Sequence, residues 1–281
     1  MKRHSFFQVL WHANNLLLLV CFLALVYGVG REYSTRRYLK GFADAVVPLS
    51  ASPEQKVEAI LEWMKHGPAR RVSVDTDSLT LRDPQDTLNY QQLLRVCGTA
   101  TNAFINLASS SGLQARRLLL LGPNWQSKHV VAEVRLDGRW VVVDPAYRAM
   151  FRDPQGQLLT RQQLQDPRLF RGAVQAIPGY SSEYTFERTA HVRLARMPVV
   201  GNLLRKTLGT LLPEWEETLD WTFVLERRSL AQALAALLLV CFGLAGRLAL
   251  GWYGRGRLGI SRVRLRDQLL RAGEDLFSSS R

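Results

Sequence analysis

Two long apolar segments near the ends of the chain constrain its fold more than any other feature. The first lies within residues 1–30 and follows the basic pair Lys2-Arg3. The second occupies residues 229–252 and is interrupted only by Arg247, which can reach the membrane surface from that position. About 20 apolar residues suffice for a helix to cross a bilayer. We therefore expect an uncleaved N-terminal transmembrane anchor, with signal-peptide cleavage as the alternative, and a second transmembrane helix.

The formal charge of +13 is concentrated beside these two segments. Residues 1–40 and 231–281 each carry a balance of +5, whereas residues 41–230 carry only +3. Basic residues that flank apolar helices contact anionic lipid and set topology. The charge therefore indicates a lipid bilayer as partner and argues against nucleic acid.

The basic tail at 253–281 predicts a cytoplasmic C-terminus. Two spans then place both termini in the cytoplasm and the central domain outside it, which would be the periplasm for a bacterial inner-membrane protein. The basic residues within 31–40 favour the opposite orientation. They weigh less, because long translocated domains blunt the influence of loop charge.

Between the anchors, Asp137-Gly138 joins two apolar-rich runs and gives the strongest short hairpin signal. If these two residues form the loop, the ladder starts at Leu136 and sets His129 diagonally across from Asp144, about 7–8 Å away at the backbone. A slip of one residue would bury that His and Asp and expose the other face. This other face is apolar throughout: Val130, Ala132, Val134, Leu136, Val141 and Val143.

Cys97 precedes a helix-like run that stops near Gly112. At a helix N-terminus the positive end of the macrodipole and the free N–H groups favour a thiolate, and the same N–H groups can stabilise an oxyanion. Gly98 allows a substrate backbone to approach closely. Gln91 and Gln92 lie just upstream and are candidate side-chain donors to the oxyanion.

Cys97 is the only cysteine of the central region, because Cys21 and Cys241 fall in the apolar segments. No disulfide framework is therefore expected there. A single cysteine is more often an inert buried residue than a nucleophile. The presence of His129 and Asp144 favours the nucleophile, because nucleophilic acyl transfer needs a thiol, an imidazole and a carboxylate.

No metal or organic cofactor is expected. Asp75-x-Asp77 lacks the glycine and the distal glutamate of a calcium loop and is typical of a solvated loop.

These residues resemble the transglutaminase-like superfamily, whose members share a papain-like cysteine-protease architecture. The resemblance covers roughly residues 50–150. It rests on the Cys-Gly start of a helix, the Gly-Leu-Gln-Ala-Arg-Arg segment that follows, a His-x-x-x-Glu-Val strand and an Arg-Trp-x-x-x-Asp-Pro strand. It implies an α+β fold in which a helix bearing the Cys packs on an antiparallel sheet bearing the His and Asp.

The resemblance also implies roles, with Cys97 as nucleophile, His129 as base and Asp144 as its orienting partner. The Cys-Gly pattern is similar to peptide N-glycanases as well. Those enzymes carry zinc-binding Cys pairs, and this chain has no C-x-x-C.

The resulting prediction is a transglutaminase-like domain at 31–228, with its core at about 50–150, held by two transmembrane helices. It would be a cysteine enzyme that forms a thioester at an amide or peptide bond of a protein or peptide substrate. The acceptor, an amine (transferase) or water (hydrolase), stays open.

The alternative is a non-catalytic or weakly catalytic scaffold in an envelope or polysaccharide-export complex. The aromatic and acidic segment 213–226 would then contact other envelope proteins; its other interpretation is an aromatic belt beside the second span.

Local patterns predict the remaining elements. A capping box and an apolar stripe at helical spacing predict a helix at 53–66. Residues 73–90 should be extended, 153–156 a turn, 160–166 a short helix, and 180–196 a strand.

Overall fold

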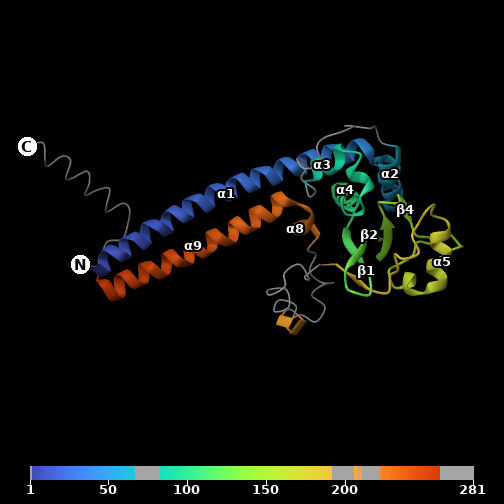
Figure 1. Ribbon diagram of the computed structural model, residues 1–281. Coiled ribbons are helices and arrows are strands. Elements are labelled where there is room, and N and C mark those ends of the chain that lie inside the picture. The colour runs from blue at the N-terminus through green and yellow to red at the C-terminus, as the bar shows by residue number, and fades with distance from the viewer. Residues whose placement is uncertain (1, 67–82, 192–205, 208, 211–221, 260–281) are drawn as a thin grey trace, which may run out of the picture. The chain divides into compact units, whose positions relative to one another are not determined.

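The computed structural model describes residues 2–66, 83–191, 206–207, 209–210 and 222–259 (Figure 1). It divides into two compact units. One combines the start of the chain up to Arg31 with its end from Gln232, and is called the helical pair below. The other, the central domain, runs from Glu32 to Ala231.

The helical pair consists of the first part of α1 (Lys2–Val46) and most of α9 (Arg228–Leu258), which run antiparallel. Small residues bring the two backbones close together: a Cβ on Gly28 would lie 3.1 Å from the Cα of Ala233. Arg247 donates to Asn15 Oδ1 at 2.6 Å, so this cation has a polar partner between the helices.

Large apolar side chains of the pair face outward. Both helices are long and apolar enough to cross a membrane. Exposed members include Leu16, Val20 and Phe22 on α1 and Leu238, Phe242 and Leu248 on α9.

The described part of the central domain contains an antiparallel sheet with strand order β4-β3-β2-β1-β5. Its strands are β1 (Ala115–Leu121), β2 (Ser127–Leu136), β3 (Arg139–Asp144), β4 (Ala149–Met150) and β5 (Thr189–Ala190). Its helices are α2 (Pro53–His66), α3 (Pro84–Asn89), η2 (Leu93–Arg95), α4 (Cys97–Ser110), η3 (Gln163–Gln165), α5 (Pro167–Gln175) and α8 (Thr222–Glu226). The predicted α+β class is confirmed.

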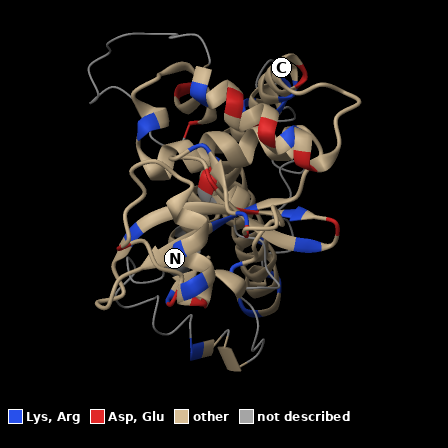
Figure 2. Ribbon diagram, turned by 90° about the vertical axis from the view of Figure 1, so that its right-hand side faces the viewer, with Lys and Arg blue, Asp and Glu red and all other residues tan. Residues whose placement is uncertain are grey.

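Charged residues of both signs are interspersed over these elements (Figure 2). This mixture fits the small charge balance of residues 41–230.

The β2–β3 hairpin has the predicted register. Leu136 pairs with Arg139, and the ladder continues to Ala132 opposite Val143. Asp137 and Gly138 have φ values of 48° and 80°, as a two-residue hairpin turn with both φ positive requires.

Both faces of the sheet are covered, which differs from the open His–Asp face that the hairpin pattern implied. On one face α2, α4 and the end of α1 pack around Phe104. On the other face, α5 and the segment after it pack around Phe151 and Phe186. His129 and Asp144 are therefore 3% and 0% exposed.

Two helices of the central domain were not predicted, and both have the same kind of N-terminus. Residues 84–89 were expected to be extended but form α3, and α5 was not expected at all. In both helices an aspartate (Asp83 or Asp166) caps the N-terminus and a proline follows at the first helical position. Each Asp-Pro pair is a helix-start signal in the sequence. At α3 this signal outweighed the polar composition, which had suggested an extended chain.

Other local predictions had mixed outcomes. The helix at 53–66 and the turn at 153–156 are confirmed. The short helix near 160–166 is a single 3₁₀ turn, η3. The strand predicted at 180–196 is wrong before residue 189, because residues 180–188 form turns and only β5 pairs. Residues 192–196 and the Asp75-x-Asp77 pattern lie outside the described residues.

Of the aromatic and acidic segment 213–226, only residues 222–226 are described, and they form α8. Thr222 and Glu226 are buried in the central domain. At least this part of the segment is not an exposed contact surface.

Candidate active site

Cys97 is the first residue of α4 and is half-buried. Val96 ends the preceding chain in an extended conformation with ψ at 127°, so the helix starts at the cysteine. The Thr101 hydroxyl donates to the carbonyl of Val130 at 3.0 Å, which fixes the first turns of α4 against β2. The thiol therefore lies at a helix N-terminus, as predicted.

His129 and Asp144 meet across the hairpin. His129 Nε2 donates to Asp144 Oδ2 at 2.7 Å. The other carboxylate oxygen, Oδ1, accepts from the backbone N–H groups of Ala146 and Tyr147 at 3.0 and 3.2 Å. Because both oxygens are engaged, the carboxylate is fixed in orientation and in turn fixes the imidazole.

The thiol and the imidazole are electrostatically coupled. A hydrogen bond with His129 lowers the pKa of the Cys97 thiol against the opposing effect of burial, and the N–H groups of Val130 and Gly98 add to the lowering. Burial by itself would lower the pKa of His129, but hydrogen bonds with Asp144 and Cys97 raise it to about 9. Both shifts favour a thiolate beside an imidazolium.

Three tyrosines surround the imidazole and were not anticipated from the sequence. Tyr184 stacks on His129, with ring centroids 4.2 Å apart and planes within 5°. Tyr147 and Tyr180 meet the ring edge-on at 5.9 and 6.3 Å. All three belong to residues 147–184, where the tyrosine content was the only available signal. They shield the His–Asp pair from water.

Tyr180 is also close to Asp144. Its hydroxyl is buried and has no hydrogen-bond partner within the described residues. Burial and the nearby carboxylate raise the pKa of Tyr180 well above its ordinary value, so the phenol stays neutral.

The candidate oxyanion donors lie in the turn before η2. Gln91 is exposed and Gln92 is partly exposed there. Their role as donors stays a prediction. Within the described residues, no cluster of three or more His, Cys, Asp or Glu could hold a metal ion.

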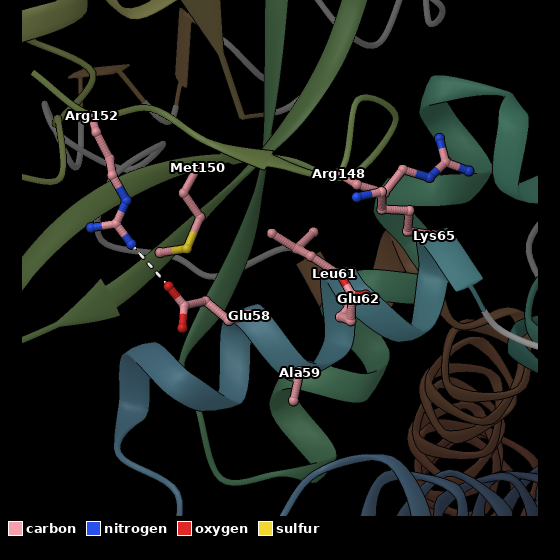
Figure 3. Close-up of a pocket in the computed structure, with 8 residues that line it drawn as sticks. All are labelled: Glu58, Ala59, Leu61, Glu62, Lys65, Arg148, Met150 and Arg152. Atoms are coloured by element: carbon pink, nitrogen blue, oxygen red, sulfur yellow. Dashed lines mark hydrogen bonds and ion pairs between the residues drawn. The ribbon is translucent and has the colours of Figure 1, made fainter. Parts of the chain in front are cut away.

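A groove of about 570 Å³ lies between α2 and β4 (Figure 3). It contains none of the predicted site residues. Arg148, which lines it, has a positive φ of 53° and donates from Nη2 to the carbonyl of Leu94 at 2.9 Å. The loop that follows Asp144 is thereby tied to the segment that leads into Cys97. Across the groove, Arg152 pairs with Glu58 of α2 at 3.0 Å.

Comparison with known proteins identifies the fold around this site. Residues 40–145 match the model of the transglutaminase-like superfamily. The match contains Cys97, His129 and Asp144, and the chain therefore carries a transglutaminase-like domain in this region. A search of curated proteins and a search of solved structures each gave no match.

Proposed function

We propose that the transglutaminase-like domain is a cysteine enzyme that forms a thioester at an amide or peptide carbonyl of a protein or peptide substrate. The alignment of Cys97, His129 and Asp144 carries this proposal. A thiol at a helix N-terminus is electrostatically coupled to an imidazole, which lowers the pKa of the thiol, and the imidazole Nε2 lies 2.7 Å from a fully buried carboxylate.

In the first half of the reaction, the Cys97 thiolate attacks the carbonyl carbon and the carbonyl electrons move to oxygen. The first N–H groups of α4 have no partner within the helix and can donate to this oxyanion. As the C–N bond breaks, imidazolium His129 gives its proton to the leaving nitrogen. A neutral amine or ammonia departs, and the acyl group stays on Sγ as a thioester.

In the second half, neutral His129 takes a proton from an incoming amine or water molecule as this nucleophile attacks the thioester. This proton transfer restores the imidazolium, and the tetrahedral intermediate then collapses and expels the Cys97 thiolate. Asp144 holds one nitrogen of the ring throughout, which leaves the other nitrogen for the proton transfers.

Transfer to an amine and hydrolysis share these steps, and access of water to the thioester decides between them. The tyrosines shield the His–Asp pair, whereas Cys97 is only half-buried. The acceptor therefore reaches the thioester from the exposed side of the cysteine.

We further propose that α1 and α9 anchor the enzyme in a membrane, with both termini in the cytoplasm and the central domain outside. The outward-facing apolar side chains and the basic flanks support this topology. Reporter fusions at the C-terminus and within residues 100–200 test it. Reporters active on the same side of the membrane would refute it.

The enzymatic proposal is tested with a thiol-directed probe on the wild type and Cys97→Ala, then with incorporation of a tagged amine and release of free amine. A variant lacking Cys21 and Cys241 is the matched control and should keep full labelling and activity. If Cys97 is unreactive and Cys97→Ala leaves the cellular phenotype unchanged, the enzyme proposal fails and a scaffold role takes its place.

A further inference from the structure

A buried polar network joins α4 to distant parts of the central domain. Asn102 and Asn106 lie on α4, Glu32 lies on α1, and Glu226 and Arg227 directly precede α9. All five residues are more than nine-tenths buried. Burying charged groups is costly unless they are paired and hydrogen-bonded.

Arg227 is the centre of one half of this network. Its Nε donates to Asn106 Oδ1 at 2.7 Å, and its Nη1 donates to Glu32 Oε1 at 3.1 Å. The Ser229 hydroxyl donates to the second oxygen of Glu32 at 2.7 Å. A buried ion pair with its hydrogen bonds satisfied adds little net stability, but it specifies one arrangement of the elements that it joins.

Glu226 forms the other half. Asn102 Nδ2 donates both to the Glu226 carbonyl at 2.7 Å and to its Oε2 at 2.9 Å. The second carboxylate oxygen pairs with Arg117 Nη1 on β1. A Cβ at Gly98 would lie 3.4 Å from Arg117 Nη2, so this guanidinium lies against the helix turn that contains the nucleophile.

We propose that this network is a positioning element for Cys97. Arg227 and Glu226 hold α4 through Asn106 and Asn102, and Glu226 holds Arg117 beside Gly98. The inference rests on the proposed function, because it concerns the geometry of the same thiol and imidazole. Glu32, Glu226 and Arg227 lie outside the matched residues 40–145.

The physical reason is that the interaction between the Cys97 thiol and the His129 imidazole weakens as the distance between the two groups grows. The imidazole is fixed on the sheet by Asp144, whereas the thiol moves with the end of α4. A shift of the helix by about 1 Å is enough to lower reactivity strongly. The residues that join α1 to the central domain and lead into α9 therefore control the alignment of the site.

The test compares Arg227→Met with Arg116→Met in the full chain in detergent or lipid vesicles. Arg116 is a matched control because it also pairs with a buried glutamate, Glu133, at 2.8 Å, and its guanidinium lies over the ring of Trp140. The readout is the rate of Cys97 alkylation by iodoacetamide against pH, which needs no substrate. Thermal unfolding measures the stability of each variant.

We expect Arg227→Met to slow alkylation at pH 7 about tenfold and to move the midpoint of the pH profile upward by about one unit. Arg116→Met should leave the profile unchanged even where it lowers the unfolding temperature. Glu32→Gln, which keeps the shape of the side chain, should shift the profile in the same direction by less.

A folded Arg227→Met protein with the wild-type profile overturns the proposal, as does an equal shift in Arg116→Met. If Arg227→Met does not fold, Glu32→Gln decides by the same criterion. A wild type with a reactive Cys97 but no acyl transfer would instead refute the proposed function and leave the positioning role intact.

Discussion

Replacing Asp144 by Asn tests the electrostatic coupling of the site most directly. The carboxylate is fully buried and is the principal hydrogen-bonded partner that raises the pKa of His129 from 6.5 to about 9. That rise corresponds to about 3 kcal/mol in favour of the imidazolium. The neutral amide keeps the shape of the side chain but removes the charge, so burial then lowers the pKa of the imidazole.

The thiol should respond because each charge stabilises the other. Without an imidazolium beside it, the pKa of Cys97 rises towards its ordinary value, and alkylation at pH 7 falls between about tenfold and a hundredfold. In the wild type, Cys97 should still be alkylated at pH values below the ordinary thiol pKa. The alkylation rate should change a second time near pH 9, where His129 loses its proton. Asp144→Asn should abolish both features.

The assay is the pH dependence of iodoacetamide labelling at Cys97, with labelled peptide quantified by mass spectrometry. Asp153→Asn is the matched control, because that carboxylate also accepts backbone hydrogen bonds but lies in an exposed turn. The reasoning would be refuted if Asp144→Asn were labelled at pH 7 as fast as the wild type. Acyl transfer, where measurable, should fall by about 10³–10⁴-fold in the same variant.

Three further predictions concern the surroundings of the site. Tyr184→Ala should lower kcat about tenfold, while Tyr184→Phe should retain the wild-type kcat because it keeps the stacked ring; equal loss in both variants would contradict a stacking role. If Gln92 donates to the oxyanion, Gln92→Ala should lower kcat about 10²-fold with unchanged thiol labelling; an unchanged kcat would leave the oxyanion to the N–H groups of α4. Gly138→Ala should lower the free energy of unfolding by about 1 kcal/mol or more, because φ is 80° there, whereas Gly172→Ala in α5 should raise it by up to about 1 kcal/mol in a denaturant titration.

The part of the site that could be predicted from the sequence is the part set by local rules. A two-residue turn and a period of two place His129 diagonally across from Asp144 without any knowledge of the rest of the chain. The start of α4 at Cys97 follows from helix periodicity and the glycine at its end. Both depend only on residues within a few positions of the site.

The covering of the sheet could not be predicted in this way. Tyr184 lies 55 positions after His129 in the chain, in a stretch of turns with no periodic pattern. Arg227 lies 121 positions after Asn106, and nothing in the sequence around either residue indicates the partner. Contacts between residues so far apart in the sequence depend on the path of the chain between them. Short-range sequence patterns do not determine that path.

The segment that matches the family does not contain all the residues that shape the site. The family match ends at residue 145, one position after Asp144, so it holds the three residues of the proposed chemistry. The ring stacked on His129 and the arginine bonded to Asn106 both follow it. A fragment limited to 40–145 would uncover the sheet face that bears the His–Asp pair and leave Asn102 and Asn106 without Glu226 and Arg227. Water would then compete for the His129–Asp144 hydrogen bond, and α4 would lose the contacts that hold its buried amides. The residues that define the family are thus insufficient for the geometry of this site, which depends on the segments that connect it to α1 and α9.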